Sequence, residues 1–257
     1  MTKLKVMSLN LMTDSLYPIG DKRFSIRYKA ILSLIHQEQP DLIGIQELTP
    51  TMFAFLQSLF TDYEIFGDSR HSFFYNEYSS VLYRKDRFQK TYGTTKWLSS
   101  KPDKPSSHLA TSMFPRIVTI VHLLDKQTNE EFTFANTHLD ANLPSVRTLQ
   151  AIILTSILFS EQKGNIILTG DFNTISTSDA LKALTKLNIK DAINDTIGST
   201  LVGPLGSRSH EYKPIDHIFV SNNIQITKSY KVTDTFNGIQ PSDHYPVVAQ
   251  IEIGNAL

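Results

Sequence analysis

The sequence predicts an α/β fold in which a mixed sheet, or two sheets packed face to face, is covered by outer helices. Short segments rich in Val, Ile, Thr and Phe recur along all 257 residues, as is typical of strands. Several are apolar on both faces, as in strands covered on two sides, and helical patterns lie between them. One pair of strands is joined by a turn too short for a crossover helix, so the strands cannot all be parallel.

Eight short apolar segments are expected to form strands. They are residues 4–10, 41–47, 80–84, 116–124, 131–138, 165–171, 215–220 and 245–253. The short turn DKQTNE separates the fourth segment from the fifth, which predicts an antiparallel hairpin.

Four segments are expected to form helices, namely residues 23–39, 49–60, 145–159 and 178–187. In the first, one face gathers the apolar residues Ile26, Ala30, Ile31, Leu34 and Ile35. Pro40 ends that helix, and Thr49 and Pro50 stand in the order favoured at an N-cap and first helical position. The intervening loops at 17–21, 99–107 and 198–214 do not resemble interdomain linkers. We therefore expect a single domain over residues 1–257.

Composition excludes several functions. The chain has no cysteine, which rules out disulfides, Cys-ligated zinc and thiol nucleophiles. The 25 Lys and Arg balance the 25 Asp and Glu, which argues against a surface built for long nucleic-acid tracts. No secretory signal or bilayer-spanning run is visible. We expect a cytoplasmic protein without a membrane anchor or an evident obligate protein partner.

Polar side chains gather at the ends of these apolar strands. Most such residues cap a turn, but here six strand ends share the pattern. They carry Asn10, Glu47, His138, Asp140, Asp171, Asn173, Asp216, His217, Asp243 and His244. Clustered carboxylates repel each other unless a cation or raised pKa values neutralise them. Oxygen ligands without thiolate favour Mg²⁺ or Mn²⁺, and Asn10, Glu47 and Asp243 are natural candidates.

The Asp-His pair at 243–244 carries a geometric constraint. Neighbouring side chains on an extended segment point to opposite faces, so Asp243 is badly placed to orient His244. Asp216 is the candidate carboxylate from elsewhere in the chain. It would fix the imidazole tautomer and stabilise the imidazolium.

Six segments in order resemble the endonuclease/exonuclease/phosphatase superfamily. They are SLN (8–10), IQE (45–47), NTHLD (136–140), GDFN (170–173), IDHIFV (215–220) and SDHYPVVAQI (242–251). Further segments resemble the bacterial branch that is similar to the catalytic domain of eukaryotic deadenylases; they lie at 67–70, 76–88, 97–106, 114–126 and 136–151. The resemblance implies a deoxyribonuclease I-like four-layer sandwich, with two packed mixed sheets flanked by helices and the site at one rim.

The resemblance also implies metal-assisted hydrolysis of a phosphate ester by water. The positions around a Mg²⁺ or Mn²⁺ ion correspond to Asn10, Glu47 and Asp243, with Glu47 the principal ligand. Asp171 corresponds to the carboxylate that orients or deprotonates the attacking water.

The remaining catalytic positions of the family act on the phosphoryl group. Asn173 and His138 correspond to groups that hold its oxygens. His244, backed by Asp216, corresponds to the essential histidine. Such hydrolysis needs in-line water and neutralised equatorial oxygens, which these residue types can supply.

Further residues are candidates for substrate binding. Arg70 and Glu77 lie on a loop that could frame the substrate. Asp140 is a third candidate, with a bracing pair to Arg147 as the alternative. Arg116 could reach a phosphate or serve as a strand-end charge.

Several aromatic residues and one histidine have two interpretations. Trp97 and Leu98 are expected to pack in the interior. Phe73–Phe74, Tyr75 and Tyr78 could form an aromatic wall, although core packing is favoured. His217 is either a neighbour of the site or a surface group.

The main alternative function is a catalytically inactive binding scaffold of the same fold. Such a protein should have lost at least one of Glu47, Asp171, Asp243 and His244, and this chain has all four. The expected partner is a phosphate ester, with short nucleic acids, nucleotides, phospholipids, inositol phosphates and sugar phosphates all left open.

Overall fold

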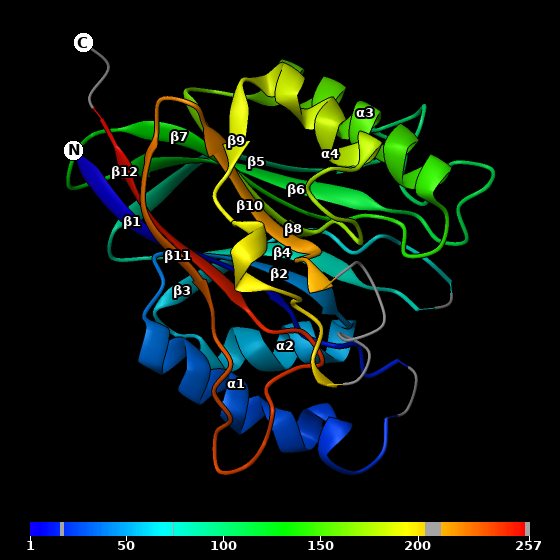
Figure 1. Ribbon diagram of the computed structural model, residues 1–257, viewed down its shortest axis with the longest axis vertical. Coiled ribbons are helices and arrows are strands. Elements are labelled where there is room, and N and C mark those ends of the chain that lie inside the picture. Colours follow the sequence, from blue (N-terminus) through cyan, green and yellow to red (C-terminus); the bar gives the residue numbers. More distant parts are fainter. Residues whose placement is uncertain (16–17, 74, 204–211, 255–257) are drawn as a thin grey trace.

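Two six-stranded sheets pack face to face in the computed structural model (Figure 1). It describes residues 1–15, 18–73, 75–203 and 212–254. Parts of the loops expected at 17–21 and 198–214, and Phe74 of the expected aromatic wall, lie outside the described residues. We call the two layers the first and the second sheet.

The first sheet has the strand order β11-β12-β1-β2-β4-β3. Its strands are β1 (Thr2–Asn10), β2 (Leu42–Leu48), β3 (Tyr63–Phe66), β4 (Tyr78–Arg84), β11 (Gln225–Lys231) and β12 (Val247–Ile253). The second sheet has the order β5-β6-β7-β8-β10-β9. Its strands are β5 (Phe88–Trp97), β6 (Ile117–Asp125), β7 (Glu131–His138), β8 (Asn165–Asp171), β9 (Ile189–Asp191) and β10 (Asp216–Ser221).

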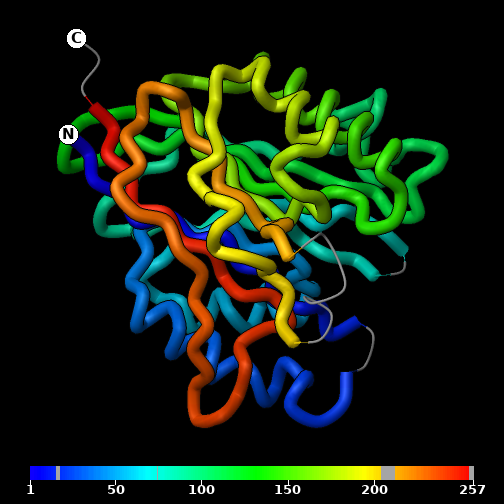
Figure 2. The backbone as a smooth tube through the Cα atoms, in the orientation of Figure 1, coloured from blue at the N-terminus to red at the C-terminus, as the bar shows by residue number. Residues whose placement is uncertain are grey.

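Helices cover the outer face of each sheet (Figures 1 and 2). The first sheet packs against α1 (Phe24–Glu38) and α2 (Pro50–Leu59), and the second against α3 (Pro144–Glu161) and α4 (Asp179–Leu184). One apolar cluster fills the space between the sheets, and one lies under each pair of helices. Short 3₁₀ turns lie at Gly20–Lys22, Thr185–Leu187 and Asp195–Ile197. The predicted four-layer sandwich is confirmed.

Local sequence explains where several helices begin. Thr49 caps α2 by accepting a hydrogen bond from the backbone N–H of Met52 at 3.2 Å, as predicted. Ser178 caps α4 in the same way, through the N–H of Leu181 at 3.3 Å. In the part of the chain that is described, no helix is long and apolar enough to cross a membrane.

The prediction of which α1 residues face the interior is wrong for one residue. Ile26 is 44% exposed, because it lies at the edge of the buried stripe, whereas Arg27 is buried within it. The guanidinium of Arg27 donates to the backbone carbonyls of Leu11, Met12 and Pro241 at 2.7–2.8 Å. A search for apolar residues at helical spacing does not find this arginine. Its hydrogen bonds join α1 to the loop after β1 and to the loop before β12.

The topology brings the polar strand ends to one rim. In the first sheet β1 and β2 are parallel and end together, and the antiparallel β12 begins at that edge. The second sheet repeats this arrangement, with β7 and β8 parallel and β10 antiparallel. The predicted hairpin of β6 and β7 is also confirmed.

A buried polar network joins the two sheets close to that rim. Asn136 of β7 donates to the backbone carbonyls of Ile45 and Ser80 in the first sheet, at 2.8 and 2.9 Å. Its side-chain oxygen accepts from Gln46 at 2.7 Å and from Thr169 at 3.1 Å. Because buried polar groups are costly unless paired, this set of contacts specifies how the sheets face each other.

Candidate active site

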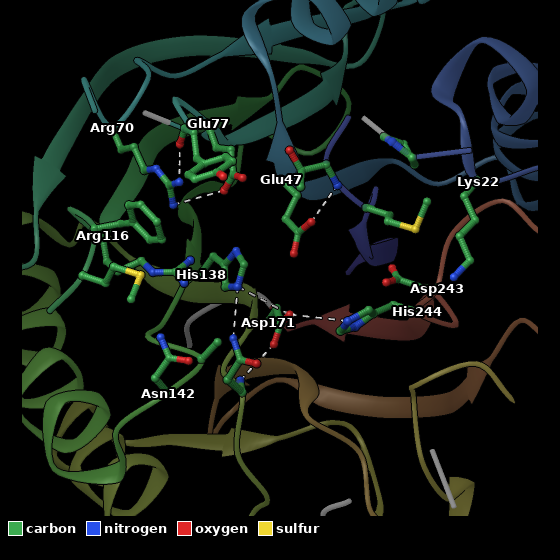
Figure 3. A pocket seen from close by; sticks show the side chains of 18 residues that line it. Lys22, Glu47, Arg70, Glu77, Arg116, His138, Asn142, Asp171, Asp243 and His244 are labelled. Atoms are coloured by element: carbon green, nitrogen blue, oxygen red, sulfur yellow. Dashed lines mark hydrogen bonds and ion pairs between the residues drawn. The ribbon is translucent and has the colours of Figure 1, made fainter. Parts of the chain in front are cut away.

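A cavity of about 730 Å³ opens where the strand ends meet (Figure 3). Side chains from both sheets and from the loops around them line it. The lining residues are Met12, Thr13, Pro18, Lys22, Glu47, Arg70, Tyr75, Glu77, Met113, Phe114, Arg116, His138, Ala141, Asn142, Asp171, Asn173, Asp243 and His244.

Glu47 enters the cavity from an irregular position in β2. The pairing of β2 with β4 shifts register between Ile45 and Leu48, and Glu47 has a left-handed φ of 61°. A bulge of this kind re-aims a side chain at a local conformational cost. The carboxylate is held by Asn10 Nδ2 at 3.0 Å and by the backbone N–H of Thr13 at 2.7 Å.

Asp171 lies at the buried centre of the site. One carboxylate oxygen accepts from Asn10 Nδ2 at 3.0 Å, and the other accepts from the backbone N–H of Asn173 at 2.9 Å. Burial, with a smaller contribution from Asp216, raises the pKa of Asp171 to about 7, while His244 opposes the shift. This carboxyl group can therefore take up or release a proton near neutral pH.

His244 lies between two carboxylates. Its Nδ1 is 2.8 Å from Asp216 Oδ2, and its Nε2 is 3.8 Å from Asp171 Oδ2. Burial alone would lower the pKa of His244, but Asp216 and then Asp171 raise it well above the usual value. The ring is therefore an imidazolium at neutral pH. The structure thus brings His244 to the carboxylate that the sequence indicated.

His138 is in the opposite protonation state. Burial first, and then the nearby Arg116 and Arg70, lower the pKa of His138 well below its usual value. Asn173 Nδ2 donates to His138 Nε2 at 3.0 Å and to the carbonyl of Leu139 at 3.1 Å. Nε2 of His138 is therefore an acceptor, and the ring is neutral. The site holds one neutral and one charged imidazole on either side of Asp171.

The donor atoms fit a divalent cation. Glu47, His138 and Asp171 each offer one ligand atom, and these atoms lie within 4.8 Å of one another. Burial leaves the charge of Asp171 poorly compensated, which a cation would correct. Carboxylate oxygens suit Mg²⁺ or Mn²⁺, whereas the imidazole nitrogen is a less typical ligand for these ions.

This grouping differs from the metal set expected from the sequence. Asn10 turns its amide nitrogen to the two carboxylates, and its oxygen accepts from the backbone N–H of Met12 at 2.9 Å. Asn10 is therefore a hydrogen-bond donor in this arrangement. Asp243 lies beside His244 on the far side of the cavity from His138 (Figure 3) and is absent from the cluster. Its carboxyl pKa is raised by burial, with His244 opposing and Glu47 adding to the shift.

The expected substrate residues divide into two groups. Arg70 and Glu77 line the cavity and form an ion pair at 3.1 Å, and Arg116 lines the same side. Asp140 does not line the cavity, because its carboxylate accepts from the N–H groups of Asn142 and Leu143 at 2.8 and 3.0 Å. It acts inside its own loop.

The alternative prediction, that Asp140 pairs with Arg147, is correct in that the two residues are in contact, but the contact is through the backbone of Asp140. Arg147 Nη1 donates to the backbone carbonyl of Asp140 at 3.0 Å, rather than to its carboxylate. The contact joins α3 to the segment that follows His138. Asp140 and Arg147 thus stabilise the loop at the rim.

The aromatic residues that the sequence analysis singled out differ in their burial. Trp97 and Leu98 are buried, as expected, and Trp97 Nε1 donates to the carbonyl of Arg70 at 3.0 Å. Tyr78 stacks on Phe53 with ring centroids 4.6 Å apart. Tyr75 is 41% exposed and lines the cavity, and Phe73 is 93% exposed, so core packing is wrong for both.

His217 is fully buried and is not a surface group. Its Nδ1 lies 2.7 Å from Asp191 Oδ2 and its Nε2 lies 3.1 Å from the carbonyl of Thr174. Because both partners are acceptors, both ring nitrogens carry protons. His217 therefore joins the loop after Asn173 to β9, a role that no sequence pattern indicated.

The rim residues that sequence analysis missed belong to loops. Met12, Lys22 and Met113 line the cavity, yet none stands at a strand end or in a segment that resembles the family. Their place depends on how loops from both sheets come together, which the local sequence does not encode.

Comparisons with known proteins agree with this geometry. The family model described as "Endonuclease/Exonuclease/phosphatase family" matches residues 7–244. "Uncharacterized protein L388" of Acanthamoeba polyphaga mimivirus is 28% identical over 97% of this chain and 100% of its own.

Solved structures share the whole architecture. The mannosyl-6-phosphatase Bt3783 of Bacteroides thetaiotaomicron VPI-5482 is 28% identical, with a TM-score of 0.84 over 97% of this chain and 100% of that one. The human Nocturnin catalytic domain is 20% identical, with a TM-score of 0.72 over 97% and 94%, and shows the fold alone. With the family match spanning both sheets and every strand end at the rim, the chain belongs to the endonuclease/exonuclease/phosphatase family.

Proposed function

We propose that residues 1–257 act as one catalytic domain that hydrolyses phosphate esters with the help of Mg²⁺ or Mn²⁺. One observation carries the proposal, namely that a buried carboxyl titrating near neutral pH lies between a neutral and a charged imidazole. Asp171 is that carboxyl, and His138 and His244 are the two imidazoles. Pairs of groups with divergent pKa values are typical of acid–base chemistry.

Each residue has a role that follows from its contacts. Glu47, with Asp171, would hold the ion, which supplies charge stabilisation to the phosphoryl oxygens when it is bound. Asn10 positions Glu47 and Asp171 by donating to both. Asp243 adds negative charge on the opposite wall.

The attacking water would be oriented by Asp171, which accepts its proton as the new P–O bond forms. The bond from phosphorus to the ester oxygen breaks, and that oxygen takes a proton from solvent as the alcohol leaves. His244, kept protonated by Asp216, stabilises the negative charge that spreads over the phosphoryl oxygens. The protonated Nδ1 of His138 would donate to one of those oxygens, and Asn173 holds the ring by donating to its Nε2.

The inactive scaffold is the competing function. It is disfavoured because Glu47, Asp171, Asp243 and His244 all line one cavity. The 28% identical mannosyl-6-phosphatase supports small phosphate esters, sugar phosphates included, as substrates.

Hydrolysis of a panel of phosphomonoesters and phosphodiesters tests the proposal. The panel includes sugar phosphates, nucleotides, short RNA, DNA and phospholipids, each with Mg²⁺, Mn²⁺ or EDTA. Turnover should require the metal and fall at least ~10²-fold in Glu47→Gln and in His244→Ala. Both variants should unfold at nearly the wild-type temperature. Retained turnover in both would overturn the assignment of the site.

A further inference from the structure

Arg116 is a buried cation whose side chain is incompletely paired by the described residues. It precedes β6, lines the cavity and is only 8% exposed. Its Nε has no hydrogen-bond partner within the described residues, and no ion pair joins its guanidinium to a carboxylate there. Buried charges are costly unless they are paired, so this guanidinium calls for an anion from outside the protein.

Arg70 supplies a second guanidinium group on the same side of the cavity as Arg116, a side that we call the arginine wall (Figure 3). It pairs with Glu77 at 3.1 Å, donates to the carbonyl of Tyr75 and lies over the ring of Phe114 at 4.7 Å. These contacts hold it in place, yet its buried Nε also has no partner among the described residues. Burial lowers the pKa of Arg70 to about 10, Glu77 opposes the shift and Arg116 adds to it. Two guanidinium groups thus share the single carboxylate of Glu77.

The wall closes behind these residues. The space beyond them is a cavity of about 10 Å³, lined among others by Arg70, Glu77, Arg116 and His138, which is room for about one water molecule. An ester chain cannot continue through it. Only terminal oxygens of a phosphoryl group can therefore face this side of the cavity.

We propose that Arg116, with Arg70 beside it, binds the terminal oxygens of a phosphomonoester and makes the chain selective for monoesters over diesters. A monoester presents three terminal oxygens and a charge of about −1.5 to −2 near pH 7. The guanidinium fork matches such an oxygen pair. A diester has a single charge and a second ester group, which would meet the closed wall. This selectivity rests on the proposed hydrolase function and names its substrate class.

Binding without catalysis tests the subsite. Phenyl phosphate and methyl phenyl phosphate, a monoester and a diester of the same phenol, are titrated by calorimetry in EDTA. Wild type should bind the monoester at least ~10-fold more tightly, as for one charge-assisted contact. Arg116→Met should remove most of that difference. Arg116→Lys should keep part of it, because the charge stays while the fork is lost.

Arg84→Met is the matched control, since it removes one arginine charge from β4 far from the cavity lining. It should bind both compounds as wild type does. Equal binding of the two compounds by wild type, no binding of either, or unchanged selectivity in a folded Arg116→Met would overturn the subsite. Hydrolysis with Mg²⁺ or Mn²⁺ is measured separately, so a folded wild type that selects the monoester but hydrolyses nothing would count against the proposed function alone.

Discussion

Asp171 and Asp216 are register partners on the antiparallel strands β8 and β10. Like charges directly opposite in a sheet destabilise it, and here the imidazolium of His244 lies against both, at 3.8 and 2.8 Å. The pair of carboxylates explains why one histidine stays protonated. Burial, and then the charge of Asp216, raise the pKa of Asp171 to about 7.

Removing one member of this pair should change the charge of the histidine. In Asp216→Asn the pKa of His244 should fall, because the largest contribution that raises it is lost. The variant should then lose the imidazolium as pH rises through a lower value, and turnover should drop by about 10²–10⁴-fold. NMR titration of the histidine ring protons in metal-free protein measures the shift directly. Asp103→Asn, at an exposed position, serves as the control, and an unmoved His244 titration in Asp216→Asn would contradict this account.

Metal binding should stabilise the fold through Glu47. A ligand that binds only the folded state adds about 2.7 kcal/mol at 100 times its dissociation constant. Mg²⁺ or Mn²⁺ should therefore raise the unfolding temperature of wild type but not of Glu47→Gln. Glu64→Gln, on the edge strand β3, should respond as wild type does. An equal rise in all three proteins would place the ion elsewhere.

Loss of Asn136 should be costly for stability. In Asn136→Ala the carbonyls of Ile45 and Ser80 lose their donor, and Gln46 loses an acceptor. Unsatisfied buried groups cost about 1–3 kcal/mol each, so we expect a loss of about 3 kcal/mol or more in urea unfolding. A loss under about 1 kcal/mol would show that water replaces these contacts. Thr227→Ala, at an exposed side chain on β11, is the comparison.

His217 should make stability depend on pH. Burial alone would lower the pKa of His217, but Asp191 and the hydrogen bonds to Asp191 and Thr174 raise it above the usual value. A group whose pKa is raised on folding stabilises the protein fully below its unfolded pKa of about 6.5. That contribution is lost as pH rises through the folded pKa.

The difference in unfolding free energy between wild type and His217→Gln should therefore be largest below about pH 6.5 and shrink toward alkaline pH. His36→Gln, on the exposed side of α1, should show no such trend. A difference that stays constant across this range would mean that folding leaves the pKa of His217 unchanged.

Sequence patterns predicted the interior strands but not the borders of the sheets. The strands that went unpredicted are β3, β5, β9 and β11, which are the edges of the two sheets. Edge strands are short or partly exposed, so they lack the continuous apolar run that marks a central strand. The exposure of β11, QITKSYK, shows this plainly, since none of its side chains is fully buried.

Only those features of the site that depend on the local geometry of the chain could be predicted from the sequence. The contact of His244 with Asp216 could be predicted because the adjacent Asp243 points to the opposite face of an extended segment, so that another carboxylate had to orient the ring. The orientation of Asn10 did not, because an amide turns according to donors and acceptors that arrive from other segments. That Arg116 Nε lacks a hydrogen-bond partner among the described residues is likewise a property of the folded surroundings and leaves no trace in the sequence.

The close approach of the two sheets has a consequence for how such a site can diverge. A methyl group on Gly44 would meet Thr169 Oγ1 at 1.9 Å and Asn136 Oδ1 at 2.5 Å. The spacing of the two sheets, and with it the distance between the site residues that each sheet carries, is therefore fixed by contacts in the protein interior. The loops that carry Met113 and Asn142 take no part in these contacts. Insertions and substitutions in those loops can exchange one substrate for another while the distance from Glu47 to Asp171 stays the same.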